Sequence, residues 1–436
     1  MADIRIAAIA KLPEQQQHVT QYGEIFELPY FTMKEIYNAI PPHCFNSSAT
    51  RSLFYLARDV GYISILVYAS SFIQYIPVAY ARAFLWTAYT VLQGICFTGI
   101  WILAHECGHG AFSKYKKLNW TMGLLMHSFL LVPFHSWRIT HSAHHKRTGN
   151  LEKDTAFVPR SRKAWIEANF GTGADAASVE LSHLAEDAPL VVLWNCLVHQ
   201  LFGWPGYLFF NVTGQKYSIP FPKQSHFYPG RDSPFWKKDQ LPLIVLSNIA
   251  VMSMIVMLAI GGYLFGFVEM LRLYAVPYLW VNHWIGKLQT LYFQHLLIQS
   301  LVAITFLHHT DGSLPHYQNS TWTFVRGATA TIDRDFGFID KHLFHNIVGT
   351  HVCHHLISTI PFYHTREASI AIRKVMGRHY RSNTKTSFMT AFWKTYKECK
   401  FIEESVDGSG VYFFRNLHGV GTSPKRLSVN MNGEER

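Results

Sequence analysis

Three short segments of the chain concentrate histidine. They read HECGH at residues 105–109, HSAHH at residues 141–145 and HVCHH at residues 351–355. On a helix, residues three or four positions apart share a face, so each segment would aim two or three imidazoles at one place. A chain with 25 histidines among 436 residues would contain an HxxHH pattern by chance about 0.1 times, whereas this chain contains two. The pattern therefore predicts a metal site.

The number of imidazoles narrows the kind of metal site. Imidazole is a good ligand for iron, zinc, copper and nickel. Eight clustered imidazoles exceed what one ion needs but suit two ions that keep open positions. Soluble di-iron proteins use Glu-x-x-His pairs inside a helix bundle. Glu106 with His109 and Glu180 with His183 match that spacing, but Glu180 lies in a polar stretch away from any expected bundle. A histidine-rich centre therefore fits this sequence better.

Two other classes of protein could explain part of the pattern. HECGH also matches the HExxH motif of zinc proteases, in which two histidines bind zinc and the glutamate is the general base. A protease has no need for two further HxxHH segments, however, and Gly108 is a poor helix former. A metal transporter would place its ligands within its membrane spans. Measured metal content distinguishes a di-iron protein, with near two irons per chain, from a protease with one zinc. Uptake of a metal isotope tests the transporter.

Long apolar segments set the positions of the histidines. Residues 53–76, 84–104 and 241–268 are nearly free of charge and long enough to cross a bilayer. A fourth crossing is expected within residues 270–307. We therefore predict an all-α integral membrane protein with four transmembrane helices in two hairpins. The polar segments that follow each hairpin would then share one face and form a helical cap that carries the metal site.

Basic residues indicate which face this is. The second apolar segment is followed by Lys114, Lys116, Lys117, Arg138, Lys146, Arg147 and Lys153. By the positive-inside rule, the stretch that contains these basic residues is cytosolic. The net charge of +11 does not form one basic stripe, so we expect no nucleic-acid partner. The six cysteines are scattered, which favours reduced thiols.

The chain divides into three parts by composition. Residues 1–50 form a polar N-terminal segment, residues 51–416 the membrane domain with its cap, and residues 417–436 a polar tail that we expect to be disordered.

The order and surroundings of the histidine segments resemble a known family. HECGH, HSAHH and HVCHH follow the spans in the same order as in the membrane fatty acid desaturases. Longer stretches strengthen the resemblance, and they extend it from about Pro41 to Arg415: HSWRITHSAHH (135–145), FLHHTDGSLPHY (306–317), ATIDRDFG (330–337) and IPFYH (360–364). These stretches are similar to the methyl-end desaturases, of Δ12 and ω-3 type, in their fungal form.

The resemblance implies cofactors, partners and a set of ligands. It implies two non-haem iron ions, O2 as co-substrate, and electrons from cytochrome b5 and its NADH-dependent reductase, in the endoplasmic reticulum membrane. No HPGG haem-binding motif occurs in the chain, so the electron donor would be a separate protein. The family also has a histidine after its last span, which His309 matches better than its neighbour His308. The expected iron ligands are His105, His109, His141, His144, His145, His309, His351, His354 and His355.

Carboxylates near these histidines could accept hydrogen bonds from the imidazoles and so orient them. The candidates are Glu106, Asp154, Asp311, Asp333 and Asp335.

The resemblance also implies the reaction. A side-chain base cannot remove hydrogen from an unactivated methylene, so the chemistry would belong to the metals and oxygen, and the protein would position the acyl chain. We expect a cis double bond in an 18-carbon acyl chain carried on phospholipid or coenzyme A, with Δ12 (oleate to linoleate) ahead of ω-3/Δ15 or a bifunctional Δ12/Δ15 activity. A related acyl hydroxylase is the next alternative.

One segment departs from the family. Residues 286–301 stand where the family's counterparts of residues 281–285 and 302–307 are almost continuous. They extend the fourth apolar segment to 38 residues, whereas one crossing needs about 20, and they place Lys287 within it. Our hypothesis is that these sixteen residues are a retained intron in the gene sequence. Uniform presence of the 48 bases in mature transcripts would contradict it.

Overall fold

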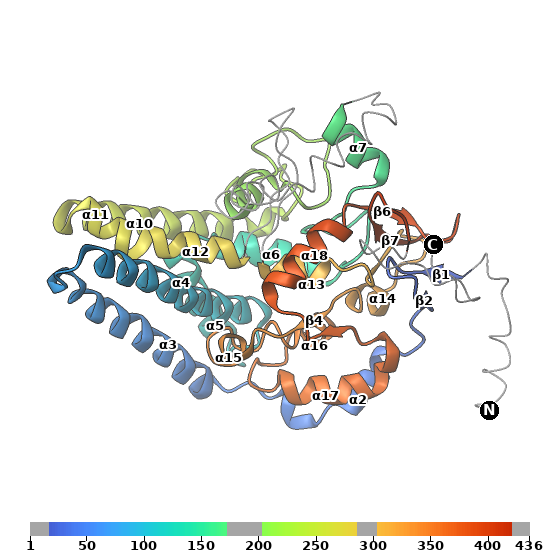
Figure 1. Cartoon of the computed structure of the whole chain (residues 1–436), viewed down its shortest axis with the longest axis horizontal. Coiled ribbons are helices and arrows are strands. Elements are labelled where there is room, and N and C mark those ends of the chain that lie inside the picture. Colours follow the sequence, from blue (N-terminus) through green and yellow to red (C-terminus); the bar gives the residue numbers. More distant parts are fainter. Residues whose placement is uncertain (1–16, 172–202, 286–302, 421–436) are drawn as a thin grey trace.

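Four helical segments lie side by side on one side of the molecule (Figure 1). The computed structural model describes residues 17–171, 203–285 and 303–420. The four segments are α3 (Ala49–Ser70), α4 (Ala79–His109), α10 (Leu241–Phe265) and α12 (Val276–Ile285). A short 3-10 turn, η3 (Ile73–Tyr75), precedes α4. The connection from α10 to α12 is helical too, through α11 (Phe267–Met270) and the π-helical turn η5 (Leu271–Ala275).

Three of these helical segments are long and apolar enough to cross a membrane. They comprise residues Ala49–Tyr75, Ala79–His109 and Lys238–Phe265. The large apolar side chains of α3 and α10 face outward, and Ile65 is 65% exposed and Tyr263 89%. A face of this kind suits lipid and not water. The three predicted spans thus have helical counterparts, while the fourth remains a prediction because residues 286–302 lie outside the described residues.

Helix α4 is the central element of this bundle. It contacts both α3 and α12, and its C-terminal half is buried. The close approach to α12 depends on Gly94, since a Cβ at this position would lie 2.3 Å from the Cβ of Trp280. Small residues allow membrane helices to approach closely in this way. Helix α4 ends at His109 and is capped by Gly110, whose φ of 77° is a backbone conformation that favours glycine.

Shorter helices gather at the inner end of the bundle. Helices α5 and α6 pack against α4 and against α10. The second half of the described chain adds short helices around the same region. The bounds are α5 (Lys116–Phe129), α6 (Phe134–His145), α7 (Arg162–Phe170), η4 (Lys238–Gln240), α13 (Ala303–His309), α14 (Phe324–Ala328), α15 (Gly337–His342), α16 (His351–Leu356), α17 (Thr365–Met376), η6 (Gly377–His379) and α18 (Phe388–Glu398).

The N-terminal segment packs onto these later helices. It contains α2 (Met33–Ala39) and the 3-10 helix η2 (Pro42–Phe45). Thr32 and Glu35 form a reciprocal capping box at the start of α2, which satisfies two backbone donors there. Helices α2 and η2 both contact α17. The buried apolar side chains of these elements form a second core, separate from the core around α4.

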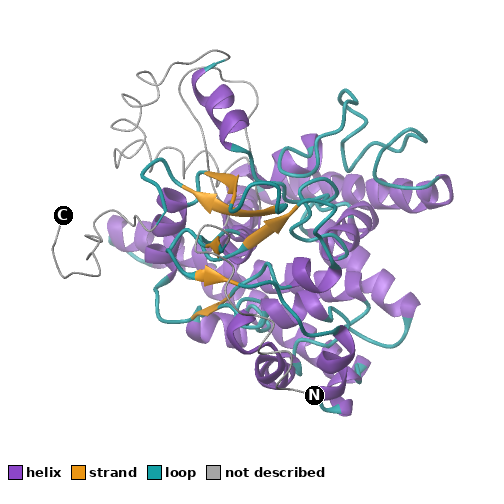
Figure 2. Cartoon of the chain, turned by 90° about the vertical axis from the view of Figure 1, so that its right-hand side faces the viewer, coloured by secondary structure: helices purple, strands orange, loops and turns teal. Residues whose placement is uncertain are grey.

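The described residues also form short strands, so the predicted all-α class is only partly right. The strands are β1 (His18–Val19), β2 (Ile25–Phe26), β3 (Pro315–Tyr317), β4 (Asp333–Arg334), β5 (Ser382–Asn383), β6 (Phe401–Glu404) and β7 (Val411–Arg415). The largest sheet has the order β3-β7-β6 and is antiparallel. Figure 2 shows the strands gathered among the helices.

The β6–β7 hairpin is not among the predicted elements, and it has a local cause. Two β-prone segments flank a turn in which Gly408 and Gly410 have φ of 73° and 69°. Glycine adopts such angles without strain, and β-prone segments joined by a short glycine-containing loop are a hairpin signal.

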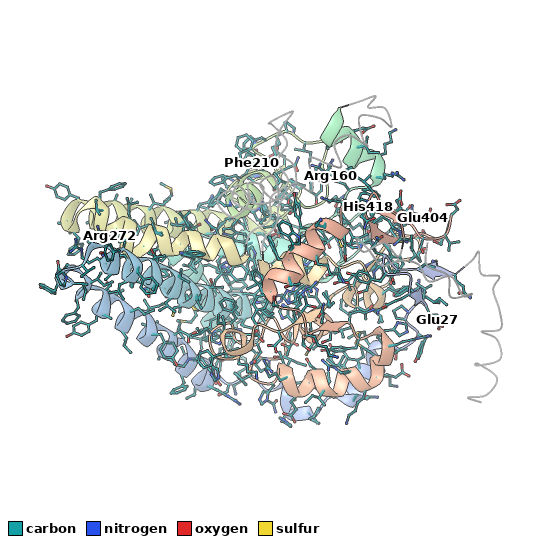
Figure 3. All side chains as sticks on the ribbon, in the orientation of Figure 1. Glu27, Arg160, Phe210, Arg272, Glu404 and His418 are labelled. Carbon is teal, nitrogen blue, oxygen red and sulfur yellow. The ribbon has the colours of Figure 1, made fainter. Side chains whose placement is uncertain are left out.

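The strands lie away from the bundle's outer end. Figure 3 places Arg272 at that end, whereas Glu27, Glu404 and His418 lie in the opposite part. Arg272 pairs with Glu269 at 3.1 Å there. Two further predictions cannot be compared with the structure, because residues 286–301 and most of the expected tail at 417–436 lie outside the described residues.

Candidate metal centre

The histidine segments meet at the inner end of the bundle because of where their helices stop. His105 and His109 lie in the last two turns of α4, the HSAHH segment ends α6, and His309 ends α13. The third segment, HVCHH, forms most of α16. The C-terminus of a helix carries partial negative charge, which favours a cation. Three helix ends therefore contribute favourably to the same cation-binding region.

Eight of the nine predicted ligands form two groups. In each group one ring nitrogen per histidine lies within 4.8 Å of the others. The first group comprises His105, His109, His141, His145 and His354, and the second comprises His144, His309 and His355. The ninth residue, His351, lies beside the second group, with its Nε2 3.3 Å from the Nε2 of His309. Two adjacent groups suit two metal ions.

Distances between ring nitrogens show how tightly the imidazoles converge. The Nε2 atom of His141 lies 3.0 Å from that of His105 and 3.1 Å from that of His145. The rings of His145 and His355 stack with centroids 4.1 Å apart, which brings the two groups into contact. His354 Nε2 and His355 Nε2 are buried and have no hydrogen-bond partner among the described residues. Buried polar atoms are usually satisfied, so these nitrogens fit a role as metal ligands.

The electrostatics of the site favour neutral imidazoles. Burial lowers the pKa of His141, His145 and His354 well below its usual value, and neighbouring histidines lower it further. Metal ions bind the unprotonated ring. The histidines outside the spans are therefore ready to act as ligands at neutral pH.

Two polar side chains fix the orientation of ligand rings in the second group. His144 Nδ1 donates a hydrogen bond to Asp154 Oδ1 at 2.7 Å. Asp154 is itself held by the backbone N–H groups of Ala156 and Phe157. The hydroxyl of Thr148 donates to the carbonyl of His144 at 2.8 Å and lies 3.1 Å from His355 Nδ1. Each arrangement leaves the Nε2 of the ring directed at the centre of the group.

The other predicted carboxylates have varied surroundings. Glu106 is buried with one oxygen 3.4 Å from His105 Nδ1. Asp311 binds Arg334 and Ser313. Asp333 accepts hydrogen bonds from the backbone N–H of Val352 and the hydroxyl of Tyr380, and Asp335 is exposed and accepts from the Gly337 N–H. The last three carboxylates thus contact an arginine, hydroxyl groups and backbone N–H groups.

One residue near the centre, Thr148, was not predicted from the sequence, and a second, His308, was the weaker of two neighbouring candidates. Thr148 follows HSAHH by three residues, and its contact with His355 joins positions 207 apart in the chain, so no local pattern reveals it. His308 has one ring nitrogen against the Ile304 carbonyl and the other 2.9 Å from the Val348 carbonyl. Since both ring nitrogens face carbonyls, His309 is the better placed of the two neighbours to hold a metal.

A largely apolar pocket opens onto both histidine groups. Aromatic and aliphatic side chains make up most of its wall apart from the imidazoles. The lining comprises Trp101, Ile102, Trp137, Ala156, Trp204, Tyr207, Ile304, Thr305 and Ile347, together with His105, His141, His144, His309, His351 and His355. A pocket of this composition suits an apolar ligand whose reacting carbons approach the imidazoles.

Comparison with known proteins identifies the family. The family model described as "Fatty acid desaturase" matches residues 83–386, which contain all three histidine segments. An oleate hydroxylase of Claviceps purpurea is 42% identical over 424 residues, covering 92% of this chain and 84% of that protein. A Δ12 fatty acid desaturase of Mortierella alpina is 41% identical over 392 residues, covering 89% and 92%. An omega-6 desaturase of Glycine max, named as an endoplasmic reticulum isozyme, is 38% identical over 394 residues with the same coverage.

These matches confirm the resemblance drawn from the motifs. They also account for both HxxHH segments, which a zinc protease would not need. The chain belongs to the fatty acid desaturase family.

Proposed function

We propose that this protein is an oxygen-dependent fatty acyl desaturase that converts an oleoyl chain to a linoleoyl chain by forming a cis double bond at Δ12. The observation that supports this most strongly is the pair of imidazole groups at the apolar pocket. The Δ12 desaturases among the relatives, at about 41% identity over most of the chain, favour this position of the double bond over the ω-3 position.

Two iron ions fit the donor set. The first would be held by His105, His109, His141, His145 and His354, and the second by His144, His309 and His355, with His351 beside them. The bound irons supply the activation of O2 that hydrogen removal from unactivated methylenes requires. Overall, two hydrogens leave adjacent carbons, and O2 takes up these together with two electrons and two protons to give two waters.

The protein's own residues bind, orient and exclude water. Trp101, Trp137 and Trp204 would hold the acyl chain in a fixed path, so that C12 and C13 lie beside the imidazole groups. Their apolar rings keep water from the reacting carbons. Asp154 and Thr148 hold the rings of His144 and His355 in the orientation that ligation needs. The chain therefore supplies geometry, and the bound metals supply reactivity.

We infer the partners and the membrane placement from what is typical of the family. Electrons would come from cytochrome b5, reduced by its NADH-dependent reductase. The histidine cap would face the cytosol in the endoplasmic reticulum membrane, with the substrate delivered as phospholipid or acyl-coenzyme A. The basic residues that follow α4 support the cytosolic side for this cap.

A product analysis tests the proposal. The chain is expressed with and without residues 286–301 in a host that makes oleate but no polyunsaturated fatty acids, and total fatty acids are analysed by mass spectrometry with location of double bonds. Linoleate is the expected product of the shortened chain. Absence of any new fatty acid from either form, with the protein shown present and linoleate also supplied, would contradict desaturation.

Hydroxylation is the second candidate function. An oleate hydroxylase is 42% identical and covers 92% of the chain, so identity alone does not favour the desaturases. The same analysis distinguishes the two reactions, because a hydroxylase gives a 12-hydroxy acid in place of linoleate.

A further inference from the structure

A second cluster of metal-ligating side chains lies outside the centre described above. His43 and Cys44 come from η2, His364 precedes α17, and Glu367 lies in its first turn. One donor atom from each lies within 4.8 Å of the others. The Nε2 of His43 is 2.9 Å from the Glu367 carboxylate and 3.7 Å from the Cys44 Sγ. The rings of His43 and His364 are 5.4 Å apart between centroids.

The four residues are placed by packing and not by chance proximity of loops. Cys44 is fully buried in the core that joins α2, α16 and α17. Beside it, the Ser48 N–H donates to the Tyr363 hydroxyl at 2.6 Å and fixes the two segments together. His364 and Glu367 are three residues apart at the start of a helix, so they project from one face. The cluster thus brings together residues more than 300 positions apart in the chain.

One side of the cluster is open. The side chains of His43 and Glu367 are 55% and 51% exposed, respectively, whereas Cys44 closes the inner side. An exposed ion pair between His43 and Glu367 would account for two of the four residues only, since such pairs contribute little on their own. It leaves unexplained why a thiol and a second imidazole converge on the same point.

We propose that His43, Cys44, His364 and Glu367 form a binding site for one zinc ion. Zinc prefers four ligands of nitrogen, sulfur and carboxylate oxygen in a tetrahedral arrangement. A thiol and two imidazoles are poor ligands for calcium or magnesium, which prefer oxygen. The ion would replace the contact between His43 and Glu367, and Cys44 would lose its proton when it binds.

The zinc ion would link two distant parts of the chain. It would join the segment that precedes α3 to α17, which packs against α16, the helix that carries HVCHH. Metal binding to a folded site stabilises the fold that presents it. This inference does not rest on the proposed reaction, and its test does not measure activity.

Zinc binding to the purified full-length protein tests the proposed zinc site. Iron-loaded protein is titrated with zinc chloride, and zinc and iron per chain are then measured together. One zinc per chain is expected. Cys44→Ser and Glu367→Gln should each weaken zinc binding by more than the about 10–100-fold that loss of a ligand's hydrogen-bond partner costs. His342→Asn, which changes an exposed histidine outside both clusters, should bind zinc like the unaltered chain.

Cobalt gives a spectroscopic test of the same ligands. Cobalt bound in place of zinc should show a thiolate charge-transfer band that Cys44→Ser removes while the iron content stays constant. Glu367 is half exposed, so Glu367→Gln decides the matter if Cys44→Ser does not fold. Equal zinc affinity in Glu367→Gln and the unaltered chain, or a cobalt spectrum without a thiolate band, would overturn the proposal.

Discussion

The imidazoles of the candidate centre differ in how firmly they are held. His144 is oriented by a buried carboxylate that two backbone N–H groups fix in turn. His355 is oriented by a hydroxyl that is itself tied to the carbonyl of His144. Both rings belong to the smaller group of three. A group with fewer ligands depends more on each of them, so this group should respond most to loss of such support.

Replacement of the Asp154 carboxylate should weaken iron binding by the second group of histidines. Asp154→Asn keeps the shape of the side chain but removes the carboxylate that accepts the hydrogen bond from His144 Nδ1. Loss of such a partner typically costs about 10–100-fold in metal affinity. Metal analysis of purified protein over a range of free iron measures this. Asp335→Asn is the matched control, because Asp335 is exposed and accepts from the Gly337 N–H. Equal iron affinity in both variants would contradict the role given to Asp154.

For iron affinity, the hydroxyl of Thr148 should matter more than the size of its side chain. Thr148→Val preserves the shape of the side chain and removes the partner of His355 Nδ1, whereas Thr148→Ser retains a hydroxyl. We expect iron affinity to fall about tenfold or more in the valine variant and to stay close to normal in the serine variant. Iron titration of the two purified variants makes the comparison. A serine variant as weak as the valine variant would point to lost packing instead.

At the scale of elements, the contact between α4 and α12 depends on a glycine at the point where the two helices meet. In Gly94→Ala, the new Cβ would lie 2.3 Å from Trp280 Cβ, so the helices must separate. Overpacking of this kind costs about 1–3 kcal/mol. Thermal unfolding in detergent measures the loss. Gly61→Ala on α3, where a Cβ meets nothing within 4 Å, should be neutral or slightly stabilising. Equal loss in the two variants would argue against the close contact.

The apolar runs predicted the helices but not their full extent. The segment predicted at 84–104 is part of α4, which runs Ala79–His109. Hydropathy detects the bilayer-compatible portion of a helix, whereas the helix continues through His105 and His109. The β6–β7 hairpin is not among the predicted elements, because its strands, FIEE and VYFFR, are short and do not alternate between apolar and polar residues. The glycines of its turn are the one local signal for it.

The histidine ligands were more predictable from the sequence than the side chains that orient them. Spacing within HSAHH and HVCHH is local, so a shared helix face follows from sequence alone. The division of the histidines into groups of five and three depends on how α4, α6, α13 and α16 pack together. The spacing of residues along the chain does not determine this packing. Thr148 and the partners of Asp311 and Asp333 depend on the same long-range packing.

For the whole molecule, the segment at 286–301 remains the main question that the sequence raised. Helix α12 ends at Ile285 and α13 begins at Ala303, so the described residues on both sides are helical. Removal of residues 286–301 would join two helical segments into one of a length suited to a single crossing. We expect the shortened chain to form linoleate in the oleate-producing host and the full chain to form less or none. Equal product from both would show that the segment is tolerated.

The central claim is that two groups of imidazoles hold two irons. The most direct test is the metal content of the purified shortened chain, measured as iron and zinc per chain beside the variant His109→Ala. We expect about two irons per chain, as two ions in two groups require, and loss of iron in the variant. One zinc ion with no iron, or iron content unchanged by His109→Ala, would contradict the account.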